Sequence, residues 1–154
     1  MLQRIQSIYF SISFILIILV IFFPITRFIG EDSQVYLLQI WGIVLAGAAT
    51  PTIVISTIPL LILFLVIPLL LLVSLFSFKK RIRQIRFSIF SMLLMVGSLV
   101  LIYFYRRQGI ITFNAEAFFT LFAAFPIISA ILTYLGFRGV KKDEELIRSY
   151  DRIR

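Results

Sequence analysis

Midway along the chain lies the stretch Lys79-Lys80-Arg81-Ile82-Arg83-Gln84-Ile85-Arg86, which carries five positive charges in eight residues. Apolar runs of membrane-spanning length flank it on both sides, at residues 52–78 and 87–105. Lys and Arg concentrate in the cytoplasmic loops of membrane proteins. The stretch therefore predicts a cytoplasmic turn between two transmembrane helices. Isoleucines at helical spacing predict that the later helix starts inside the turn.

The composition is that of a membrane protein. Of 154 residues, 61% are hydrophobic and 14% are charged, whereas soluble domains have about 45–50% apolar and about 25% charged residues. The chain contains no cysteine and no histidine. Disulfides, thiolate metal sites and cysteine nucleophiles are therefore excluded, and so is the commonest general base near neutral pH.

We expect an all-α protein with four transmembrane helices, at about residues 5–29, 52–78, 87–105 and 117–137. Each run is long enough for a ~30 Å hydrocarbon core at about 1.5 Å per residue. The first run is too long for the apolar region of a signal peptide and has no small-x-small cleavage site after it. The prolines at positions 59, 68 and 126 are interpreted as interior kinks, which membrane helices tolerate.

Residues 34–50 are apolar but short for a span. We interpret them as a helix at the outer interface, with Tyr36 and Trp41 at headgroup depth. A fifth span remains the alternative. Arg106 and Arg107 are interpreted as marking the outer interface, and residues 108–116 as a short external loop.

The segment 138–154 is predicted to be a short amphipathic helix outside the membrane. Asp143 would cap its first turn, and Glu144 would pair with Arg148. The consecutive acids at 143–145 resemble a metal site only superficially, because acids in a first helical turn usually serve capping. We expect no metal and no cofactor.

The distribution of positive charge predicts the orientation. Four spans place twelve Lys and Arg residues on the side of both termini and leave three on the other side, namely Arg27, Arg106 and Arg107. Both termini are therefore expected in the cytoplasm. The net charge of +8 is interpreted as a topology signal and as attraction to anionic lipid, not as a nucleic-acid site.

No catalytic motif is present, and no acid lies within a predicted span. Coupled ion transport normally needs ionisable groups at membrane depth. We therefore expect no enzyme but a non-catalytic accessory or assembly subunit that contacts lipid headgroups, a membrane protein partner or further copies of itself. The alternative is a component of a small oligomeric transporter or channel. The candidate contact residues are Gln3, Arg4, Gln6, Lys79, Lys80, Arg81, Arg83, Arg86, Lys141, Lys142, Asp143, Glu144, Glu145, Arg148, Asp151 and Arg152.

The two ends of the chain, MLQRIQSIY at residues 1–9 and RGVKKDEELIRSYDRIR at residues 138–154, resemble a family of small Bacteroidota membrane proteins catalogued as domain of unknown function 4293. The family pattern begins M-I-Q-R-I-Q-T and ends R-x-I-R-K-D-E-x-L-V-R-S-x-D-R-L-R. The resemblance implies a bacterial inner-membrane protein with four helices and implies no activity. Because both recognisable ends are expected in the cytoplasm, we hypothesise that they contact each other or a shared partner, with Gln3, Arg4 and Gln6 near the tail carboxylates.

Overall fold

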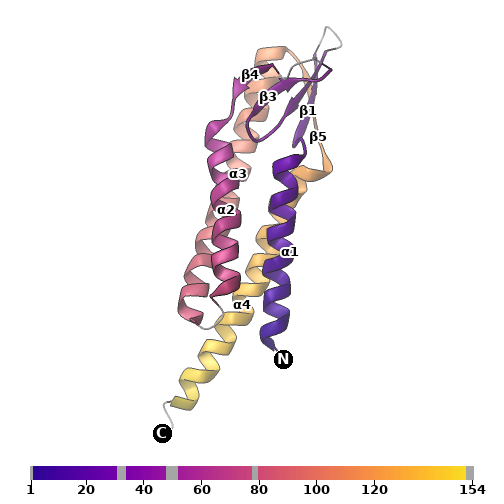
Figure 1. Ribbon diagram of the computed structural model, residues 1–154. Helices are drawn as coiled ribbons and strands as arrows, with labels where there is room; N and C mark the ends of the chain where they lie inside the picture. Colours follow the sequence, from indigo (N-terminus) through magenta and orange to yellow (C-terminus); the bar gives the residue numbers. More distant parts are fainter. Residues whose placement is uncertain (1, 31–33, 48–51, 78–79, 152–154) are drawn as a thin grey trace.

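The computed structural model describes residues 2–30, 34–47, 52–77 and 80–151. It contains four long α-helices: α1 (Leu2–Phe22), α2 (Ile58–Phe76), α3 (Arg81–Phe113) and α4 (Phe125–Asp151). All four are long and apolar enough to cross a membrane, which confirms the expectation of four helices of that length and composition. They form an elongated bundle in which both termini lie at the same end (Figure 1).

A five-stranded antiparallel sheet covers the other end of the bundle, which we call the sheet end (Figure 1). Its strands are β1 (Thr26–Ile29), β2 (Val35–Leu38), β3 (Gly42–Leu45), β4 (Ile53–Ser56) and β5 (Glu116–Phe119), in the order β4-β3-β2-β1-β5. The register pairs Phe28 with Tyr36 on one side and with Ala117 on the other. The expectation of an all-α protein is therefore wrong.

The interfacial helix expected at residues 34–50 does not exist in the described part of that segment, which forms β2 and β3. A fifth span there is wrong for the same reason. The connection at residues 39–41 is tight, since Gln39 and Gly42 exchange backbone hydrogen bonds of 2.9 and 3.3 Å. β2 and β3 contain Val, Ile and Tyr, which favour strands. Their backbone groups are paired between neighbouring strands, not within a helix.

Three of the expected spans included residues that belong to the sheet. β1 follows the first helix, β4 precedes the second, and β5 with a 3₁₀ turn (η1, Leu121–Ala124) precedes the fourth. Two of the prolines interpreted as interior kinks consequently lie at helix starts, Pro59 in the first turn of α2 and Pro126 at the second residue of α4. A missing N–H costs little in a first turn. Pro68 does lie inside α2.

The third helix starts in the basic turn, as predicted, but it is much longer than 87–105. It continues to Phe113, where Asn114 ends it in the left-handed conformation with φ 44°. The external loop expected at 108–116 is therefore wrong over most of its length, because residues 108–113 belong to α3. The extra turns pack against the sheet: the Tyr36 and Phe113 rings stack at 4.1 Å, and a Cβ on Gly109 would lie 2.7 Å from Phe28.

The separate tail helix beginning at Asp143 is also wrong, because α4 runs without a break from Phe125 to Asp151. Asp143 is an interior residue of α4 and does not cap it. The lower part of α4 projects past the other helices (Figure 1).

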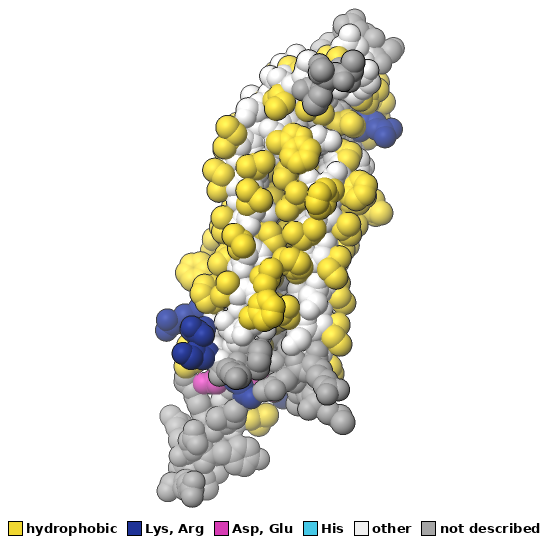
Figure 2. All heavy atoms as spheres, viewed as in Figure 1, with side chains coloured by type: hydrophobic (Ala, Val, Ile, Leu, Met, Phe, Trp, Pro, Cys, Tyr) yellow, Lys and Arg dark blue, Asp and Glu magenta, His cyan; other side chains and the backbone are white. Residues whose placement is uncertain are grey.

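The bundle interior is apolar but includes hydroxyls that bond to backbone carbonyls. Between α1 and α4, the Ser13 hydroxyl donates to the Ser129 carbonyl at 3.2 Å, and the Ser129 hydroxyl donates to the Ser13 carbonyl at 3.3 Å. Small hydroxyl side chains let membrane helices approach closely and bond across the interface. The outer surface is an apolar belt, with basic side chains gathered near its lower end and again near the sheet (Figure 2).

Candidate interaction site at the basic end of the bundle

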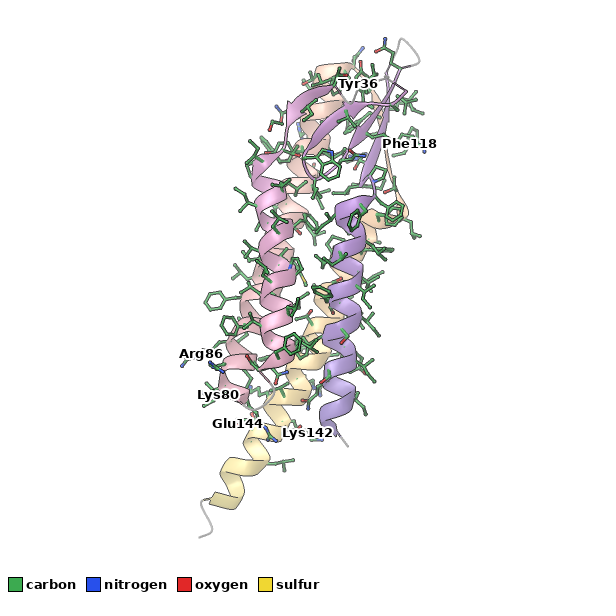
Figure 3. The ribbon with its side chains drawn as sticks, viewed as in Figure 1. Tyr36, Lys80, Arg86, Phe118, Lys142 and Glu144 are labelled. Atoms are coloured by element: carbon green, nitrogen blue, oxygen red, sulfur yellow. The ribbon has the colours of Figure 1, made fainter. Side chains whose placement is uncertain are left out.

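The end of the bundle opposite the sheet, which we call the basic end, collects most of the candidate contact residues. The turn between α2 and α3, the beginning of α1 and the lower part of α4 meet there (Figure 1). Lys80, Arg86, Lys142 and Glu144 lie together at this end, whereas Tyr36 and Phe118 lie at the sheet end (Figure 3).

A buried polar cluster fixes the orientation of the basic turn. Gln84 is buried at the start of α3, and its carbonyl accepts hydrogen bonds from the hydroxyls of Ser74 (3.4 Å) and Ser88 (2.8 Å). The two hydroxyls lie 3.0 Å apart and join α2 to α3. Because Gln84 faces inward, the helical period turns its cationic neighbours outward. The side chains exposed there are Lys80, Arg83 and Arg86.

Asp143 joins α4 to two other helices. Gln6 Nε2 of α1 donates to Asp143 Oδ2 at 2.7 Å, and Arg81 Nη1 of α3 donates to the Asp143 carbonyl oxygen at 3.0 Å. Gly139 permits this arrangement, since a Cβ there would lie 3.0 Å from the Gln6 side chain. Asp143 therefore fixes the position at which α4 leaves the bundle.

The exposed side chains of α4 near this point are mostly charged. Lys141, Lys142 and Glu145 are exposed, and Leu146 is 48% exposed among them. Lys141 Nζ lies 3.8 Å from Glu145 Oε1, an exposed pair one helical turn apart. Such pairs contribute about 0–1 kcal/mol to stability. This segment therefore presents charge and one apolar side chain outside the bundle.

The structure brings ten of the sixteen candidate residues to one end: Gln6, Lys80, Arg81, Arg83, Arg86, Lys141, Lys142, Asp143, Glu144 and Glu145. Gln6 is buried, and Arg81, Asp143 and Glu144 are half-buried, so these four serve the internal junction more than the surface. The side chains of Gln3, Arg4, Lys79, Arg148, Asp151 and Arg152 lie outside what the structure describes.

Sequence reasoning missed the two glycines that permit close contact between α1 and α4. A Cβ on Gly136 would lie 3.0 Å from the Phe10 ring, and a Cβ on Gly139 would lie 3.0 Å from the Gln6 side chain. Their spacing of three residues places both on one helix face, and small residues on one face are a known signal of helix contact in membranes. That signal stands in the sequence, but it does not identify the partner helix.

A family model described as domain of unknown function (DUF4293) matches residues 2–153. The chain belongs to this family. No curated protein matches the chain. In this DUF4293 chain the two recognisable ends of the sequence lie at the same end of the bundle, and the bond between Gln6 and Asp143 joins them.

The basic end of the DUF4293 chain offers binding chemistry. Apart from the Glu145 carboxylate, its exposed charged groups are ammonium and guanidinium donors, which bind carboxylates and phosphates. Among the described residues, no three acidic side chains come close enough to hold a metal ion. The arrangement is suited to contact with an anionic surface.

Proposed function

We propose that this chain is a non-catalytic accessory or assembly subunit of the bacterial inner membrane, with both termini in the cytoplasm. The basic end would contact an acidic surface of a membrane protein partner. The basic end would also be attracted to anionic lipid headgroups, by about 1 kcal/mol for each Lys or Arg near the membrane surface.

The observation that carries this proposal is the projection of α4 beyond the bundle. A helix that served only to cross the membrane would end near the lipid headgroups, but α4 continues past the other helices (Figure 1). The hydrogen bonds to Asp143 hold its exit position. A preorganised helix loses little conformational entropy on binding, which favours a role in recognition.

A pore-forming role has less support. The Thr133 hydroxyl on α4 is buried and has no hydrogen-bond partner among the described residues. The hydroxyls of Ser88, Ser91 and Ser98 on α3, in contrast, donate to carbonyls of their own helix. These donors are already satisfied inside one protomer, so they do not form a polar face for water between protomers. The transporter alternative would need other polar groups to line its path.

The test is co-purification from native membranes in a mild detergent, with an affinity tag and mass spectrometry. The double variant Lys141→Glu/Lys142→Glu reverses two exposed cations on α4. We expect the wild-type chain to retain a partner at a near one-to-one ratio. The double variant should lower that ratio at least fivefold, because opposite charges across an interface become like charges.

The matched control is Arg107→Glu/Gln108→Glu, which places negative charge at two adjacent exposed helix positions near the sheet end. It should leave the partner ratio unchanged. Equal loss in both variants, or a wild-type chain with no stoichiometric partner, would contradict the proposal.

A further inference from the structure

We propose that a cavity between the bundle and the sheet binds a membrane lipid, with one acyl chain in the cavity and the lipid phosphate at Arg106. This site lies at the opposite end of the molecule from the basic end. It does not rest on the partner contact proposed above, with which it shares only the orientation in the membrane.

The cavity has a volume of about 290 Å³ and lies between α3, β5, η1 and the beginning of α4. Thr120 supplies a polar group to its wall, and that hydroxyl already donates to the carbonyls of Pro24 (2.6 Å) and Ile25 (2.9 Å). The rest of the wall is mainly hydrocarbon and aromatic, so the cavity suits an apolar chain. The lining residues are Leu99, Ile102, Tyr103, Phe119, Thr120, Ala123, Ala124 and Ile127.

The cavity opens sideways onto the apolar belt. Three of its lining side chains, Tyr103, Phe119 and Ile127, are each about half exposed, whereas Ile102 at the back is 4% exposed. The small side chains of Ala123 and Ala124 in η1 leave room beside α3. A lipid chain can therefore enter from the surrounding bilayer without a change in the bundle.

The position of the cavity matches the boundary of the hydrocarbon core. Along α3 no charged residue lies between Arg86 and Arg106, a distance of about 30 Å at 1.5 Å per residue. This equals the ~30 Å thickness of the hydrocarbon core. With Arg86 at one headgroup layer, Arg106 lies at the other, and the cavity one turn below it lies at the depth of the acyl chains.

Arg106 supplies a donor for the phosphate. Its Nη2 donates to the Ala117 carbonyl at 3.1 Å, and its guanidinium lies 4.6 Å from the centre of the Phe119 ring. Its Nε is buried and has no hydrogen-bond partner within the described ranges. An unpartnered buried donor is unfavourable, and phosphate oxygens are the acceptors that guanidinium binds best.

A second arginine, Arg27, lines an adjacent cavity. This cavity has a volume of about 340 Å³ and is also lined by Phe118, Phe119 and Thr120. Phe119 borders both cavities, and the guanidinium of Arg106 lies over its ring. Lys and Arg are disfavoured on the translocated side of a membrane. A bound anionic lipid would explain why Arg27 and Arg106 are present there.

The test measures binding of phosphatidylglycerol and of diacylglycerol to the purified full chain in detergent, by native mass spectrometry. Diacylglycerol has the same chains and no phosphate. The wild-type chain should prefer phosphatidylglycerol at least tenfold. Arg106→Gln should reduce this preference to less than threefold, while Arg107→Gln, the exposed neighbour with the same change in charge, should keep it.

A second pair of variants tests the acyl-chain site without changing Arg106. Ala124→Leu fills the cavity and should weaken binding of both lipids at least tenfold. Ile15→Phe, at an exposed position of α1 that does not line the cavity, should not. Equal binding in Ala124→Leu and Ile15→Phe, or equal headgroup preference in the two arginine variants, would overturn the proposal.

Discussion

At Gly136 a single added methyl group would meet a buried aromatic ring. The Cβ of an alanine there would lie 3.0 Å from Phe10 Cζ and 3.1 Å from Cε2, and Phe10 is fully buried. A rigid, enclosed ring cannot withdraw without displacing its neighbours, and overpacking of this kind costs about 1–3 kcal/mol. Gly97→Ala in α3 gains the same helix propensity without the clash. We therefore predict that the free energy of unfolding of Gly136→Ala lies about 1–3 kcal/mol below that of Gly97→Ala, measured by denaturant titration in detergent.

Gly97 provides the control at the same scale. It lies in the middle of α3, and no atom lies within 4 Å of a Cβ added there. Alanine has the higher helix propensity, so Gly97→Ala should be neutral or stabilising by up to about 1 kcal/mol. If both variants lost stability equally, the contact between α1 and α4 would not be the cause.

At the scale of elements, the helices could be predicted from the sequence but the strands could not. Runs of about 20 apolar residues identify membrane helices by length alone. Each strand has only four residues, too short for an alternating pattern to stand out in so apolar a chain. β1 does alternate between buried and exposed residues, yet Thr26-Arg27-Phe28-Ile29 also continues the preceding apolar run.

The candidate site, like the fold, could be predicted only in part from the sequence. The clustering of charge at one end follows from the sequence, because helices connected by short turns return to the same side. The hypothesis that Gln6 contacts a tail carboxylate is confirmed, although the two residues lie 137 positions apart in the chain. The sequence does not single out Asp143 among the three consecutive acids, and the helix cap predicted for Asp143 is wrong because α4 runs through it.

Gly42 decides how β4 joins the sheet. A Cβ at this position would lie 2.9 Å from the Ile55 carbonyl oxygen and 2.7 Å from Ile53 Cγ2. The Ile55 carbonyl is part of the backbone of β4 and cannot move without breaking the pairing of β4 with β3. This pairing already contains an irregularity between Ile43 and Val44. We predict that Gly42→Ala detaches β4 and leaves the helices intact.

The measurement for this prediction is hydrogen exchange by mass spectrometry. Amide protection in residues 53–56 should fall at least tenfold in Gly42→Ala, while protection in α2 and α3 stays at the wild-type level. Unchanged protection of β4 would show that the sheet accommodates the methyl group.

At the scale of the whole molecule, the charge asymmetry and the fold define two different ends. One end has an exposed cationic turn and a projecting helix, and the other has the sheet, with Arg27 on β1 and Arg106 and Arg107 on α3 beside it. The partner contact proposed for the first end requires the cytoplasm. The lipid site proposed for the second requires the outer leaflet. Both proposals therefore depend on a single orientation in the membrane.

The most direct test of this orientation is cysteine labelling, because the chain contains no native cysteine. Arg107→Cys at the sheet end and Lys142→Cys at the basic end each introduce one exposed thiol. Intact spheroplasts would be treated with a membrane-impermeant maleimide. We predict that Arg107→Cys is labelled at once and that Lys142→Cys is labelled only after permeabilisation. Labelling of Lys142→Cys in intact spheroplasts, with Arg107→Cys protected, would contradict the orientation.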